Sequence, residues 1–245
     1  MLTKIREAIA KQKFHPGPLG MLVNPFYFAR KGLLECIAPL APQVAGQVLD
    51  VGCGSKPYRA LFECESYVGM DMHNPGHDHA KEDIDVFYDG NAFPFPAEAF
   101  DSVVCFQVLE HVFDPDMLLR EIVRVLRPDG VLLLTVPFVW DEHEQPNDFA
   151  RYSSFGILHL LQRHGFTVVQ ASKSCADVRA LAQMVNAYLF KVTGAQRSVL
   201  HAAATAALTA PVTLAGAAAQ RLFPRNLDFY LDNVVLARKE GHPRP

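Results

Sequence analysis

A Rossmann-like α/β fold is predicted for this chain of 245 residues: a mostly parallel seven-stranded sheet with helices on both faces and a helical insertion before the last strand. Two observations predict it. Between residues 45 and 172, short apolar runs alternate with segments of helical periodicity, which is typical of parallel strands joined by helical crossovers. The first apolar run, residues 48–51, leads into Gly52 and Gly54, an arrangement typical of a ligand-binding turn after a first strand.

The order of elements divides the chain into a helical cap, a sheet domain and an apolar helical insertion. The cap is expected at residues 1–44, the sheet domain at residues 45–174 and 223–240, and the insertion at residues 175–222. Within the cap, helical patterns at residues 1–13 and 26–40 are separated by a Pro-Gly-Pro break.

The clearest helix of the sheet domain is predicted to begin at Asp114, a natural N-cap, with Pro115 as its first residue. Its apolar stripe reaches Leu126, and the Pro-Asp-Gly sequence at 128–130 is expected to end it. A second helix is predicted at residues 154–164. Six of the seven strands are expected at residues 48–51, 67–71, 100–107, 131–137, 166–169 and 233–238.

Composition excludes several classes of function. The chain has 23 Lys and Arg against 26 Asp and Glu, so no overall positive charge attracts nucleic acid, and no nucleic-acid partner is expected. The five cysteines include no C-x-x-C pair, which fits the reducing cytoplasm better than a disulfide framework or a zinc site. The first 13 residues lack the apolar core of a signal peptide. The chain is therefore expected in the cytoplasm.

The glycine turn favours a ligand that carries an amino acid over a dinucleotide. A dinucleotide-binding turn requires a third glycine, but position 57 is a proline. Asp50 lies two residues before Gly52, where its carboxylate would repel a pyrophosphate and attract a cationic amine. Backbone contact with the ligand is expected from Gly52, Cys53 and Gly54 because the glycines allow close approach. Alternatively, Asp50 only caps the turn by accepting from its amides.

Together with the later motifs, this turn resembles the class I S-adenosylmethionine-dependent methyltransferases of the type 11-like kind. The resemblance covers about residues 45–172 and a last strand near residues 233–238. It is strongest to bacterial members with a G-C-G-x-x-P-Y turn and a later H-x-x-P-x-D-F-x-R-Y segment, here residues 52–58 and 143–152. The resemblance implies S-adenosyl-L-methionine as the cofactor. Because such members are often found in glycan and envelope biosynthesis, it also implies a small-molecule, glycan or lipid-linked acceptor.

The resemblance implies a cofactor contact for several residues at the carboxyl ends of the strands. Asp50 would accept from the methionine amine. Asp71 ends a strand about 20 residues later and would bind both ribose hydroxyls. Met72 would lie against adenine, and Gln107 would border the methionine part.

The adenine amino group is assigned to Asp89, although Asp83 and Asp85 are nearby competitors for this role. The amide of Asn91 or Ala92 would then donate to a ring nitrogen.

Lys56 stands where the resembling family more often has glycine. Pro57 disfavours helix at Lys56, so the following helix is expected to begin later. Its ammonium, or nearby amides, would meet the cofactor carboxylate. A solvated lysine is the alternative, and both stay open.

The acceptor side offers two histidines as general base. His143 is the first candidate and His111 the second, because both follow strands at the ligand-binding edge and imidazole titrates near neutrality. A structural role, in which each ring hydrogen-bonds a loop, stays open for both. Arg151 could hold an anionic acceptor or pair with Asp148, and the second interpretation is favoured.

A metal is not expected. Some methyltransferases similar in this region, including ubiquinone-pathway and small-RNA 2′-O-methyltransferases, hold a divalent ion with an E-x-x-E-H segment, in some cases with a later histidine. His143 could be that later ligand here. Here Gln107 replaces the first carboxylate before Glu110 and His111, which weakens such a site. A separate histidine cluster is expected to lie in a solvated loop: His73, His77 and His79.

The insertion contains an uncharged run, residues 198–220, that is long enough to span a bilayer. Its alanine and threonine content and Pro211 make a poor transmembrane helix. A helical pair packed on the domain or in a homodimer is therefore favoured over interfacial membrane contact, which would place the chain peripherally at the inner membrane face.

The predicted function is methyl transfer from S-adenosyl-L-methionine, preferably to oxygen. Two alternatives stay open. One is another reaction on the same fold, such as aminopropyl transfer or nucleotide-dependent oxidation and reduction. The other is a non-catalytic adenosylmethionine-binding domain that serves a membrane-associated assembly through residues 175–222.

Overall fold

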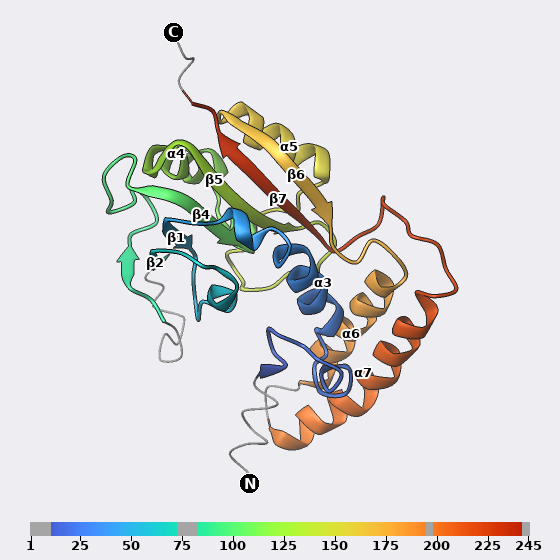
Figure 1. The fold of residues 1–245 in the computed structure, drawn as a ribbon. Helices are drawn as coiled ribbons and strands as arrows, with labels where there is room; N and C mark the ends of the chain where they lie inside the picture. Colours follow the sequence, from blue (N-terminus) through green and yellow to red (C-terminus); the bar gives the residue numbers. More distant parts are fainter. Residues whose placement is uncertain (1–10, 73–82, 195–197, 242–245) are drawn as a thin grey trace. The chain divides into compact units, whose positions relative to one another are not determined.

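The computed structural model describes residues 11–72, 83–194 and 198–241 (Figure 1). Most of the helix predicted at residues 1–13, and all of the loop with His73, His77 and His79, lie outside the described residues. The chain forms two compact units. One consists of the residues up to Cys36, Val139–Asp141 and Lys173–Asp232, and the other of Ile37–Phe138, Glu142–Ser172 and the residues from Asn233 onward.

The larger unit is built on a seven-stranded sheet in the order β3-β2-β1-β4-β5-β7-β6. The strands are β1 (Gln47–Val51), β2 (Ser66–Met72), β3 (Val86–Tyr88), β4 (Phe100–Phe106), β5 (Leu126–Pro137), β6 (Phe166–Lys173) and β7 (Asp232–Lys239). The pairs β2–β3, β1–β2, β1–β4 and β4–β5 are parallel, whereas β7 runs opposite to β6 in Figure 1. The sheet is mixed and mostly parallel, so the predicted Rossmann-like fold is confirmed.

Two helices bury their apolar stripes against this sheet. Helix α4 (Pro115–Val125) contributes Leu119 and Ile122 to the main core, and helix α5 (Ser154–Arg163) contributes Leu161. Leu132 and Leu134 of β5 belong to the same cluster, as expected for alternate residues that share one face of a strand.

The start of α4 is the predicted one. Asp114 Oδ1 accepts a hydrogen bond from the Met117 amide at 3.0 Å, and Pro115 is the first helical residue. The predicted end was too late, because α4 stops at Val125 and Leu126 already pairs with Phe100 as the first residue of β5.

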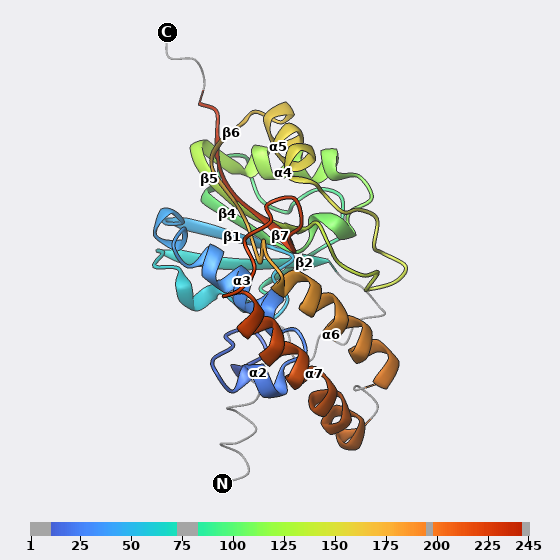
Figure 2. The same cartoon turned by 90° about the vertical axis from the view of Figure 1, so that its right-hand side faces the viewer.

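The smaller unit is mostly helical. Its elements include α2 (Gly20–Val23), most of α3 (Tyr27–Ile37), α6 (Arg179–Thr193) and α7 (Val199–Ala219). The last two form the predicted helical insertion and lie side by side in both views (Figures 1 and 2). A small apolar cluster of this unit includes Phe28, Ala180 and Leu231.

Replacing Leu119 with alanine is expected to lower the free energy of unfolding by about 2–5 kcal/mol, because the fully buried side chain leaves a cavity between α4 and the sheet. The measurement is urea denaturation followed by circular dichroism. Arg120→Ala is the matched control, since the next side chain on α4 is exposed and should change stability by less than about 0.5 kcal/mol. Equal losses in both variants would contradict this packing.

Candidate active site

The turn after β1 is bonded to the end of β2. The amides of Gly52 and Cys53 donate to the Met70 carbonyl at 2.9 and 3.2 Å. The Gly54 amide donates to Asp71 Oδ2 at 2.8 Å. The first three amides of the turn are therefore engaged by β2, and the carboxylate that caps the turn is that of Asp71.

The two glycines of the turn have different surroundings. Both have left-handed backbones, with φ of +68° at Gly52 and +45° at Gly54. A Cβ on Gly52 would come within 2.3 Å of the Val108 side chain, so this glycine packs against the residues that follow β4. A Cβ on Gly54 would meet no atom within 4 Å, so the turn presents an open face there.

Asp50 is buried at the end of β1. Its Oδ2 accepts a hydrogen bond from the Tyr67 hydroxyl at 2.7 Å. Burial raises the pKa of Asp50 to about 7; the Tyr67 bond opposes this shift, the Asp71 charge adds to it, and Lys56 opposes it. A carboxyl with this pKa is partly protonated at neutral pH. A cation bound beside it would stabilise the charged carboxylate. This environment fits the predicted contact with a cofactor amine.

Lys56 is held by an acidic partner. Its ammonium lies 2.7 Å from Asp85 Oδ2 and 3.5 Å from Asp83 Oδ2, and its side chain is only 8% exposed. Asp85 Oδ2 also accepts from the Gly69 amide at 2.7 Å. The side chain is thus not a solvated lysine, and its contact with a cofactor carboxylate stays a prediction.

The predicted adenine residues converge at the ends of β2 and β3. A Cβ on Gly90 would come within 2.8 Å of Met72 Sδ, so Met72 lies against the turn that starts at Asp89. Asp89 Oδ1 accepts from the Asn91 amide at 2.9 Å, and this bond lowers the pKa of Asp89. Since the Asn91 amide is engaged, Ala92 is the remaining candidate for a ring nitrogen.

Helix α4 fixes the segment that follows this turn. Glu121 Oε2 accepts from the Phe93 amide at 2.7 Å. Arg124 donates to the carbonyls of Phe95 and Phe93 at 2.8 and 3.0 Å, and to both carboxylate oxygens of Glu121. Two adjacent turns of α4 therefore position the segment next to the predicted adenine residues.

The residues after β4 turn sharply away from the strand. Gln107 has a φ of +57°, and its side-chain amide donates to Thr135 Oγ1 at 3.1 Å. The short helix η4 (Leu109–His111) follows and buries the Glu110 side chain completely. The Glu110 carbonyl accepts from the Phe149 amide at 2.8 Å, which joins η4 to the segment 143–152.

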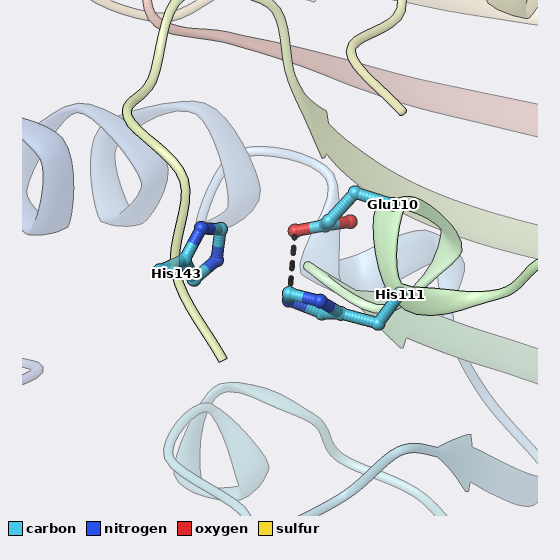
Figure 3. Close-up of side chains that lie close together, drawn as sticks. All are labelled: Glu110, His111 and His143. Atoms are coloured by element: carbon cyan, nitrogen blue, oxygen red, sulfur yellow. Dashed lines mark ion pairs between the residues drawn. The ribbon is translucent and has the colours of Figure 1, made fainter. Parts of the chain in front are cut away.

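Both predicted base histidines meet at this junction (Figure 3). The rings of His111 and His143 lie edge to face with centroids 4.7 Å apart. His111 Nδ1 is 2.6 Å from the Asn147 carbonyl, which can only accept, so Nδ1 carries a proton and, in the neutral ring, Nε2 holds the lone pair. His111 Nε2 lies 3.8 Å from a carboxylate oxygen of both Glu110 and Glu144.

His143 is oriented by an ion pair. Asp148 Oδ2 accepts from the His143 amide at 2.9 Å and lies 3.4 Å from its Nδ1. Arg151 donates to both oxygens of Asp148, at 2.5 and 2.7 Å, and holds the pKa of that carboxyl down to about 2. The favoured interpretation of Arg151, pairing with Asp148, is confirmed.

Comparison with known proteins assigns the central part of the chain. Residues 49–134 match the family described as methyltransferase domain. A protein of Mycolicibacterium smegmatis, described as a probable S-adenosylmethionine-dependent methyltransferase, is 34% identical over 125 residues, which are 48% of each chain. The matched segment is thus similar to S-adenosylmethionine-dependent methyltransferases.

Two further proteins extend the comparison. The ubiquinone biosynthesis O-methyltransferase of Haemophilus ducreyi is 34% identical over 104 residues, 36% of this chain and 44% of that one. The crystal structure of an S-adenosylmethionine-dependent methyltransferase from Mesorhizobium loti shares the fold, with a TM-score of 0.53 and 15% identity over 85% of this chain and 98% of the other. The chain thus matches about half or less of the length of its sequence relatives.

The predicted acceptor side also offers metal ligands. One ligand atom each from Glu110, His111 and His143 lie within 4.8 Å of one another. A carboxylate with two imidazoles suits a divalent transition metal. Gln107, which replaces a carboxylate in the motif, bonds to Thr135 instead. That no metal is needed stays a prediction.

Sequence reasoning missed two residues of this site. Tyr67 is a common strand residue, and nothing in its spacing marks it as the partner of Asp50. The parallel register of β1 and β2 brings the two together across the strands. Glu144 was also missed; its position next to His143 was the available signal.

Asp71→Ala is expected to weaken adenosylmethionine binding about 10- to 100-fold, because a charged acceptor for both the turn and the ribose is lost. Isothermal titration calorimetry measures the affinity. Asp228→Ala removes an exposed acid and is the control, with unchanged affinity expected. Unchanged affinity in a folded Asp71→Ala variant would contradict both roles.

Cofactor binding is expected to release a proton from Asp50. At about pH 6.5, a carboxyl with a pKa of about 7 is about three-quarters protonated, and a cationic amine favours the carboxylate. Affinity should therefore rise with pH up to about 7 and then level off. Calorimetry at about pH 6.5, in two buffers of different ionisation enthalpy, counts the proton.

Asp50→Asn is the control for this measurement, since the amide has no proton to release in this range. Equal proton release by wild type and Asp50→Asn would mean that another group titrates.

Proposed function

We propose that this chain transfers the methyl group of S-adenosyl-L-methionine to an oxygen atom of a small-molecule, glycan or lipid-linked acceptor. The observation that carries the proposal is the fixed tautomer of His111. Because Nδ1 donates to the Asn147 carbonyl, the Nε2 lone pair is available to accept a proton beside two carboxylates.

The residues divide the reaction between positioning and proton transfer. When bound, S-adenosylmethionine would supply an electrophilic methyl group from its sulfonium, and the sulfur would leave as the neutral thioether of S-adenosylhomocysteine. His111 Nε2 accepts the proton of the acceptor hydroxyl as the new oxygen–carbon bond forms. Glu110 and Glu144, each 3.8 Å away, stabilise the resulting imidazolium. His143, held by Asp148, packs its ring against that of His111 and keeps it in place.

The comparisons support oxygen as the acceptor atom, because relatives include the ubiquinone biosynthesis O-methyltransferase of Haemophilus ducreyi. The G-C-G-x-x-P-Y turn and the segment 143–152 support membership of the subgroup associated with glycan and envelope precursors. These acceptors present hydroxyl groups, which need a base near neutral pH.

A screen with methyl-labelled adenosylmethionine tests the proposal on hydroxylated small molecules, glycans, fatty acids and lipid-linked saccharides. Methylation of one class supports it. If the cofactor binds but no acceptor in the panel is methylated, the non-catalytic alternative gains.

Once an acceptor is found, His111→Gln is expected to lower kcat by about 10²- to 10⁴-fold, because glutamine cannot accept the proton. The affinity for adenosylmethionine should stay within about twofold. His159→Gln is the matched control, because this histidine is exposed on α5 and lies outside the cluster.

A chelator separates proton transfer from metal assistance at the same residues. Full wild-type activity in excess chelator is the expected result. Loss of activity that an added divalent metal restores would contradict the role of His111 as proton acceptor and favour the metal-bound alternative.

A further inference from the structure

Helix α7 buries three of its threonines and exposes three of its leucines. Thr205, Thr209 and Thr213 repeat every fourth residue and are at most 2% exposed. In contrast, Leu200 is 82% exposed and Leu208 is 50% exposed. A helix that faces water normally shows the opposite arrangement, with its apolar stripe against the protein.

The buried threonines are satisfied within the helical pair. Thr209 and Thr213 donate to the carbonyls four residues earlier, at 2.9 and 3.0 Å. Asn186 of α6 donates to Thr213 Oγ1 at 2.8 Å, and the hydroxyls of Thr193 and Thr205 bond to one another. Packing through hydroxyl and small side chains, with polar groups hidden between helices, is typical of helices surrounded by lipid.

Helix α6 continues the apolar exposure. Its exposed large residues follow a spacing of four, three and four, which places them on one face: Leu181, Val185, Tyr188 and Val192. Beyond the end of α7, Leu222, Phe223 and Leu227 are also exposed. We call these residues, with Leu200, Leu208 and Leu214 of α7, the apolar surface. Large apolar side chains exposed together on one compact unit are candidates for an interaction site.

Helix α7 is long and apolar, but it is not buried as a core helix would be. The segment Leu200–Ala219 is long and apolar enough to cross a membrane, and the mean hydropathy of its most apolar stretch is 1.4. Only 22% of that stretch is buried inside the protein. Pro211 lies inside the helix, and Arg221 follows its end. A proline-containing helix flanked by arginine fits the membrane interface better than a full span.

Positive charge gathers around the same segment. Residues 173–232 contain six Lys and Arg and three Asp, which gives this segment a net charge of +3. The net charge of the whole chain is −3, so the remaining residues together carry −6. Near the end of α7, a cavity of about 480 Å³ is lined by four cations, Lys173, Arg179, Arg221 and Arg225, and by the acids Glu35 and Asp177. Arg179 is paired with Asp177, which leaves a net positive lining.

This charge decides between two occupants of the apolar surface. In a symmetric dimer, two copies of the surface would bring their positive segments toward each other, which costs electrostatic energy. An anionic lipid headgroup would be attracted by the arginines while the acyl region covers the leucines.

We propose that the α6–α7 pair docks on the surface of an anionic bilayer. The apolar surface enters the boundary between headgroups and acyl chains, and Arg221 and Arg225 contact lipid phosphates. This inference does not depend on the methyl-transfer reaction, because it rests on the other compact unit of the chain.

Sedimentation of the full chain with vesicles tests the proposal. We expect at least tenfold stronger binding to mixed phosphatidylglycerol and phosphatidylcholine vesicles than to phosphatidylcholine alone, with weaker binding at high salt. Arg221→Gln and Arg225→Gln should each weaken binding to the mixed vesicles about fivefold.

Leu208→Asp should abolish vesicle binding, because it places a charge in the apolar surface. Phe155→Asp is the matched control, since this phenylalanine is equally apolar and 84% exposed but lies on α5. Adenosylmethionine affinity, measured on both variants, shows whether they remain folded.

Three results would overturn the proposal. The first is absence of binding by wild type, or wild-type binding by Leu208→Asp. The second is a solution dimer that Leu208→Asp dissociates without any vesicle binding, which would make the surface a dimer interface. The third is protein that alkaline carbonate cannot release from the vesicles, which would mean that α7 spans the bilayer.

Discussion

The hydrogen bond from the Gly54 amide to the Asp71 carboxylate joins the ends of β1 and β2, and the shape of the predicted cofactor turn depends on it. Strand ends leave backbone donors that need partners. The turn after β1 finds them in the Met70 carbonyl and in Asp71, so its shape is set before any ligand arrives. The same pairing of strands buries Asp50 beside Tyr67 and raises its pKa toward neutrality.

The acceptor side is organised by backbone carbonyls instead. The Glu110 carbonyl holds the segment 143–152 through the Phe149 amide, and the Asn147 carbonyl in that segment selects the His111 tautomer. An ion pair between Asp148 and Arg151 then orients His143. The protonation of the His111 ring thus depends on contacts between residues about 40 positions apart. A shift of the segment 143–152 would change which ring nitrogen can accept a proton.

The two compact units differ in which side chains they bury. The sheet unit buries leucines such as Leu132 and keeps most charges at its surface and strand ends. The helical pair buries Thr209 and Asn186 and leaves Leu208 outside. One arrangement suits water on all sides, and the other suits a partly apolar surrounding. The positive charge of the second unit is consistent with that difference.

Local sequence patterns determined the fold class, because each signal for it involves only a few neighbouring residues. These signals are the apolar strand runs, the Asp114 cap and the Gly52 turn. They also marked Asp50 and Asp71 as site candidates, since acids at strand ends lie at a common edge of a parallel sheet. Only the tertiary structure decided that Tyr67 meets Asp50 and that His111 meets His143, because those contacts depend on strand register and loop path. It also decided which face of α7 is buried, because a run of alanine, leucine and threonine has too little polarity contrast to orient a helix.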